Sequence, residues 1–149
     1  MTGVVPPDEF WQGVEQFNQQ EFYACHDTLE ALWIEASEPQ KDFYQGILQI
    51  AVACYHLGNL NWRGAVILLG EGIRRLQDYQ PSYEGIDVIE LLTESIDLLK
   101  ALQQAGSEHV ADFAQQLTTA ENKGLPENSG NAIARLPKIL RVDNEGISD

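Results

Sequence analysis

The stretch that decides the fold is FYQGILQIAVACYHL, residues 43–57. Between Gly46 and Leu57 only Gln49 and His56 are strongly polar. A helix this apolar over about three turns has no face to offer to water, and its apolar run is shorter than the ~20 residues that a membrane span needs. The stretch therefore predicts a helix buried at the centre of a helical core.

The segments around this stretch carry the signals of further helices. Their apolar residues recur at helical spacing, and Pro, Gly, Asn or Asp stands where each segment would start or stop. We expect helices at about 8–20, 21–36, 40–57, 60–76, 87–105 and 107–119. The predicted fold class is all-α, a compact bundle of five to six helices around the buried central helix at about 40–57.

Glycines mark points where the bundle is expected to be tight. Gly64, Gly70 and Gly72 weaken the fourth helix intrinsically, so we interpret them as places where a neighbouring backbone approaches closely. Gly58 follows the central helix, at a position where a left-handed cap favours glycine. Residues 81–85 are expected to form a loop.

The length of 149 residues fits a single domain with one substantial core. We expect the helical-bundle domain to occupy residues 1–123. Residues 124–131 are rich in Gly, Asn and Ser, and Pro137 is a poor helix interior. Residues 124–149 are therefore expected to form a docked, extended C-terminal arm that ends in an acidic tail.

The net charge limits the classes of partner that the protein is expected to bind. A net charge of −14 argues against nucleic acid and against anionic membrane surfaces, and it favours a basic partner or a metal cation. Arg74 and Arg75 are expected to be solvated. The small number of cysteines and the absence of a signal-like start predict a cytoplasmic protein. A homodimer is a candidate assembly, because small bundles often self-associate through apolar faces; an unknown protein or small molecule is a further candidate partner.

Several polar or aromatic side chains fall on faces that should otherwise be apolar. A helix turns by ~100° per residue, so residues one turn apart point the same way. The side chains selected by this projection are His26, Glu30 and Trp33 on the second helix and Gln45, Gln49 and His56 on the central helix.

The short connection between these two helices favours an antiparallel hairpin. Pairing the helices about a loop centre near residue 38 sets His26 opposite Gln49, and Glu30 opposite Gln45. We therefore expect one polar seam between the second and the central helix.

The chemistry of this seam leaves three interpretations open. A carboxylate buried alone is costly, so Glu30 must be paired, metal-bound or protonated. The side chains satisfy one another as a structural network, bind a small polar ligand, or hold a divalent metal ion. The ligand-binding candidates are His26, Glu30, Trp33, Gln45 and Gln49, and the metal-ligand candidates are His26, Glu30 and His56.

No residue is assigned a catalytic role, and whether the protein is an enzyme stays open. The sequence has neither His-Glu-x-x-His nor Glu-x-x-His, the common helical metal-enzyme patterns. A metal-dependent hydrolase would use a metal-bound water with Glu30 as ligand or base, and Glu30 cannot fill both roles. The leading hypothesis is binding of a small polar ligand or a divalent metal. The alternative is a non-catalytic protein-interaction module, in which the cluster is structural and the partner binds an apolar patch on the fourth helix or on residues 132–140.

Three segments carry a family resemblance: CHDTLEALW at 25–33, QGILQIAVACYHLGN at 45–59 and GA at 64–65. In order and spacing they resemble a small all-helical family catalogued as domain of unknown function 309. The likeness covers about residues 21–76, and Asp27 stands where the family more usually has Glu. The resemblance implies a helical-bundle fold and no established reaction.

Overall fold

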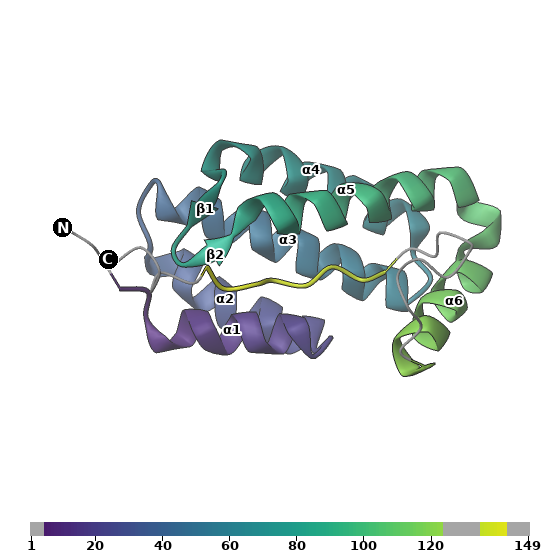
Figure 1. Cartoon of the computed structure of the whole chain (residues 1–149), viewed down its shortest axis with the longest axis horizontal. Helices are drawn as coiled ribbons and strands as arrows, with labels where there is room; N and C mark the ends of the chain where they lie inside the picture. Colours follow the sequence, from purple (N-terminus) through teal and green to yellow (C-terminus); the bar gives the residue numbers. More distant parts are fainter. Residues whose placement is uncertain (1–4, 124–134, 143–149) are drawn as a thin grey trace.

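The structure, a computed structural model, describes residues 5–123 and 135–142, with residues 118–123 as backbone only. Its described part contains six α-helices and a short antiparallel hairpin (Figure 1). The helices are α1 (Asp8–Asn18), α2 (Phe22–Glu35), α3 (Gln40–Gly58), α4 (Trp62–Leu76), α5 (Val88–Ala105) and α6 (Val110–Lys123). The strands are β1 (Ser82–Tyr83) and β2 (Ile86–Asp87). The predicted all-α bundle of five to six helices is confirmed.

Helix α3 lies at the centre of the bundle, as its apolar sequence predicts. Phe43, Ile47 and Ile50 are completely buried, and the helix packs against α2 on one side and α4 on the other. Burial of such side chains stabilises the fold by about 1.5–3 kcal/mol each. None of the helices in the described part of the chain combines the length and hydropathy that crossing a membrane requires.

The contact between α3 and α4 is close because two glycines meet there. A Cβ atom added to Gly72 would lie 2.8 Å from the carbonyl oxygen of Gly46 and 2.7 Å from Cγ1 of Ile50. A Cβ atom on Gly64 would meet the side chains of Asn61 and His56. The predicted close approach of a neighbouring backbone is confirmed at Gly72, whereas the close atoms at Gly64 belong to side chains. The prediction is wrong at Gly70, where nothing in the described structure lies within 4 Å of such an atom.

The end of α3 differs from the prediction. Gly58 is the last residue of the helix, and the left-handed conformation falls on Leu60, whose φ is 61°. The amide of Leu60 donates to the carbonyl of Leu57, and that of Asn61 donates to the carbonyl of His56. This is the Schellman pattern, in which glycine is the usual left-handed residue. The helix runs farther than expected because the carbonyls of its last turn find these partners.

Local capping signals place the starts of α4 and α5. The side-chain oxygen of Asn61 accepts a hydrogen bond from the Gly64 amide at 2.9 Å. The carboxylate of Asp87 accepts one from the Glu90 amide at 3.0 Å. Side chains of this type satisfy amides that the first turn of a helix leaves without partners. These caps agree with the Asn and Asp expected at helix starts; for α4 both Asn59 and Asn61 were candidates, and Asn61 is the cap. Residues 81–85, expected to form only a loop, contain β1.

Residues 135–142 run extended beside the bundle, near the hairpin (Figure 1). The side chain of Asn18 donates to the carbonyl of Ile139 at 2.8 Å and accepts from its amide at 2.7 Å. The guanidinium of Arg141 lies 3.9 Å from the centre of the Trp11 ring. These contacts hold the segment against α1. Residues 124–134 and 143–149 lie outside the described residues, so the division of the chain at residue 123 stays a prediction.

Candidate functional site

His26 lies in the first half of α2, at the border between the buried and the exposed face. The inward side of the helix carries Phe22, Cys25 and Leu29, all of which are buried. The rotation of the helix places His26 at the edge of this apolar face, where its side chain is 31% exposed. Glu30 follows one turn later and is 47% exposed. The predicted burial of these two side chains is therefore wrong in degree, although they do share a face.

The imidazole of His26 lies between two carboxylates. Its Nδ1 atom is 3.4 Å from Oδ1 of Asp27, and its Nε2 atom is 4.0 Å from Oε1 of Glu30. Nδ1 is sealed from solvent and makes no hydrogen bond within the described structure. Nε2 is thus the ring nitrogen through which His26 can meet a ligand from solution.

These three side chains form a group that can hold a metal ion. One ligand atom from each of His26, Asp27 and Glu30 lies within 4.8 Å of the others. Imidazole and carboxylate together suit divalent ions such as zinc. A carboxylate beside the second ring nitrogen is the usual companion of a metal-binding imidazole, because it fixes the orientation and tautomer of the ring.

Two exposed tyrosines border the group. The ring of Tyr23 stacks on that of His26, with centroids 6.1 Å apart and an interplanar angle of 28°. Tyr55 of α3 lies against Tyr23 at a centroid distance of 5.4 Å. The imidazole is therefore bordered on one side by an aromatic ring.

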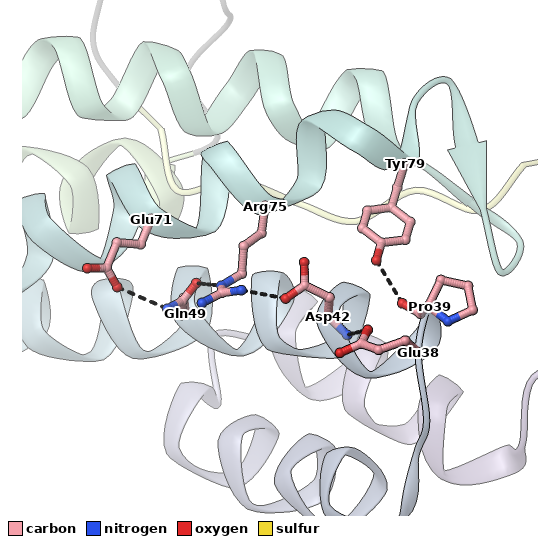
Figure 2. A network of polar contacts seen from close by, with 7 residues as sticks. All are labelled: Glu38, Pro39, Asp42, Gln49, Glu71, Arg75 and Tyr79. Carbon is pink, nitrogen blue, oxygen red and sulfur yellow. Dashed lines mark hydrogen bonds and ion pairs between the residues drawn. The ribbon is translucent and has the colours of Figure 1, made fainter.

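Gln49 is not part of this group, and the predicted seam between α2 and α3 is wrong. The side-chain nitrogen of Gln49 donates to the carboxylate of Glu71 at 3.0 Å, and the side-chain oxygen of Gln49 accepts from Nε of Arg75 at 3.0 Å (Figure 2). Arg75 also pairs with Asp42. The polar stripe of α3 thus faces α4, away from His26, and Arg75 is half-buried where solvation was expected.

The glycines explain this arrangement. Gly46 stands on the same stripe of α3 as Gln49, and it meets Gly72 and Leu76 of α4. Only the stripe with small residues allows the close packing of these two helices, so its polar members turn towards α4 as well. There the side-chain oxygen of Gln49 needs a hydrogen-bond donor, and Nε of Arg75 supplies it.

The remaining predicted residues make contacts other than those of the group. Nδ1 of His56 is 3.4 Å from the side-chain nitrogen of Asn61, and among the described residues His56 does not join the group of His26, Asp27 and Glu30. Trp33 is half-buried, with the ammonium of Lys41 at 4.2 Å from its ring centre. Gln45 is half-buried on α3. Of the predicted set, the structure brings together His26 and Glu30, and it adds Asp27 in place of His56.

The cysteines do not extend the group. Burial raises the pKa of the Cys25 thiol to about 12 and also raises the pKa of Cys54. Both thiols are buried, so near neutral pH they are neutral, and the thiolate needed for metal binding or nucleophilic attack is not formed.

The fold and this cluster define an all-α helical bundle with an imidazole–carboxylate group on the outer edge of its second helix. Residues 10–68 match the model of a family described as Domain of unknown function (DUF309), and this match confirms the resemblance. It runs from α1 into the first half of α4 and includes the His26 group.

The chain is also similar to the uncharacterized protein YpuF of Bacillus subtilis (strain 168). The two are 35% identical over 82 residues, which cover 53% of this chain and 47% of YpuF. The chain therefore spans about half the length of this curated relative. Neither the family description nor the name of the relative states a reaction or a ligand.

Proposed function

We propose that this protein binds a divalent transition-metal ion through Nε2 of His26 and the carboxylate of Glu30. The observation that carries the proposal is the position of the His26 ring between two carboxylates, with the ligand atoms within 4.8 Å of one another. Asp27, whose carboxylate lies 3.4 Å from Nδ1 without a hydrogen bond to it, has the supporting role of turning onto Nδ1 and steadying the ring when the ion binds.

The distances support this assignment. In zinc sites the metal lies about 2.0–2.2 Å from nitrogen and carboxylate oxygen ligands. The 4.0 Å between Nε2 of His26 and Oε1 of Glu30 leaves room for an ion between them after a small rotation of the Glu30 side chain. The net charge of −14 also raises the local concentration of cations.

The proposed function is metal binding without catalysis. If Glu30 is a ligand, the group contains no separate base to activate a metal-bound water, since Asp27 faces the other ring nitrogen. An ion held by two or three protein atoms also keeps open coordination positions, which water or another molecule can fill.

Thermal unfolding with and without zinc tests the proposal. After treatment with EDTA, addition of Zn²⁺ to ~100 times its dissociation constant should stabilise the protein by about 2.7 kcal/mol. For a chain of this size the melting temperature should then rise by roughly 5–10 °C. His26→Ala and Glu30→Gln should lose the rise, whereas His109→Ala, which removes an exposed histidine of another element, should keep it. An equal rise in His26→Ala would place the metal elsewhere.

The protein-interaction module remains a second candidate, and one observation favours it. Tyr23 and Ile34 on α2 are 59% and 61% exposed, although both are large and apolar. Both stand on the exposed side of the same helix, and exposed apolar surface of this kind can meet a partner. Such a surface on α2 differs from the predicted patch on α4 or on residues 132–140, where Ile139 is buried but Ile67 and Leu140 are each 47% exposed.

A further inference from the structure

The outer face of α2 carries a stripe of four exposed residues. Tyr23, Asp27, Glu30 and Ile34 are 59%, 62%, 47% and 61% exposed, respectively. They are separated by four, three and four residues. This alternation is the spacing of the seam along which two helices of a coiled coil meet. The outer stripe, defined by these four residues, therefore has the geometry of a contact for another helix.

The order of apolar and acidic side chains along the outer stripe is the same in both directions. From either end the order is apolar, acidic, acidic, apolar. If a second copy of α2 lies antiparallel on the first, Tyr23 of one copy meets Ile34 of the other. Asp27 of one copy then meets Glu30 of the other. The stripe is thus complementary to itself at its apolar ends, as an interface with two-fold symmetry requires.

The centre of such a pair is acidic and would repel without a cation. The metal ion proposed at His26 and Glu30 supplies this cation. One copy alone offers it an incomplete set of ligands, because Asp27 lies beside Nδ1, on the opposite side of the ring from Nε2. In the antiparallel pair, Asp27 of the second copy lies opposite Glu30 and can fill an open position.

We infer that a second copy of this chain docks antiparallel on the outer stripe of α2, and that the metal ion held by His26 and Glu30 bridges the two copies. This inference rests on the proposed metal site and names the partner that completes it. Tyr55, which is 41% exposed and packs against Tyr23, widens the apolar end of the interface.

The experiment measures metal content and molecular mass together on the full chain. Size-exclusion chromatography with light scattering gives the mass, and calorimetric titration with Zn²⁺ gives the stoichiometry. The inference predicts a monomer in EDTA and, with zinc, a dimer that contains one ion per chain. A dimer that persists in EDTA would overturn the bridging role of the metal.

Two matched variants locate the interface. Ile34→Asp replaces an apolar end of the outer stripe by a carboxylate and should weaken zinc-dependent dimerisation by about a hundredfold or more, because that charge is then buried without a partner against Tyr23 of the second copy. Ile67→Asp adds the same charge at a 47% exposed isoleucine of α4 and should leave the dimer intact. Equal effects of both variants would exclude the outer stripe as the interface.

The outcomes separate the two proposals. If zinc binds and the binding is lost in His26→Ala, but the wild type stays monomeric, the inferred dimer is wrong and the metal site stands. The outer stripe would then be left to a different partner. If no zinc binds, the metal site itself is wrong, and the bridged dimer fails with it.

Discussion

The sharpest structural prediction concerns two glycines on one helix. Gly70 and Gly72 are both in α4, two residues apart, and they face opposite environments. A methyl group on Gly70 would meet nothing within 4 Å among the described residues. A methyl group on Gly72 would lie 2.8 Å from the backbone oxygen of Gly46 and 3.2 Å from the backbone nitrogen of Ile50. These neighbours belong to the main chain of α3 and cannot rotate away.

The two alanine variants should therefore change stability in opposite directions. Gly70→Ala should raise the free energy of unfolding by about 0.8–1 kcal/mol, the difference in helix propensity between the two residues. Gly72→Ala gains the same propensity but must push α3 and α4 apart. Overpacking of this kind costs typically 1–3 kcal/mol, and the backbone contact places it at the upper end of that range. We expect a net loss of about 1–2 kcal/mol after the propensity gain.

Urea denaturation of the two variants, followed by circular dichroism, measures this difference directly. A midpoint that rises for Gly70→Ala and falls for Gly72→Ala, with unchanged slopes, supports the packing described here. If both variants are stabilised, α3 and α4 do not approach as closely as the structure indicates, and the reason given for the orientation of Gln49 fails with it.

Three further predictions follow from single residues. Leu60→Gly should raise the free energy of unfolding by about 1 kcal/mol in urea titrations, because glycine adopts the left-handed conformation without the penalty that leucine incurs; an unchanged or lower value would contradict this. Arg75→Met should lower it by about 1–2 kcal/mol, since Asp42 then loses its partner in a half-buried position, and a neutral effect would show that water replaces the guanidinium. Burial raises the pKa of the Glu84 carboxyl above 4.5, so the folded state retains this proton longer than the unfolded state and stability falls as pH rises through the raised pKa. Glu84→Gln removes this loss, and its stability advantage over wild type should be larger at about pH 7 than at about pH 4.5; the reverse order would refute the assignment.

The helices could be predicted from the sequence because their signals are local. Asn61 and Asp87 cap the amides three residues ahead of them, so the chain nearby contains all the information needed. The burial of α3 follows from its composition alone. The predicted end of α3 differs only slightly from the observed end. The difference arose because a non-glycine residue, Leu60, adopts the left-handed conformation.

The candidate site was harder to predict because it depends on which helices meet. Helical periodicity correctly placed His26 and Glu30 on one face, but it does not say which neighbour a face will contact. Gln49 turned to α4 because Gly46 and Gly72 make that contact close. Both glycines are visible in the sequence, and pairing them would have indicated the packing. Asp27 was noted in the family pattern but was not among the ligand candidates, because it follows His26 directly, about 100° away around the helix, and only the side-chain geometry brings it to Nδ1.

Anomalous X-ray diffraction at the zinc edge, from crystals grown with Zn²⁺, tests the metal site most directly. The account predicts a difference peak about 2.0–2.2 Å from Nε2 of His26 and from a carboxylate oxygen of Glu30. A crystal in which zinc occupies His56 or His109 while Nε2 of His26 carries no peak would contradict it.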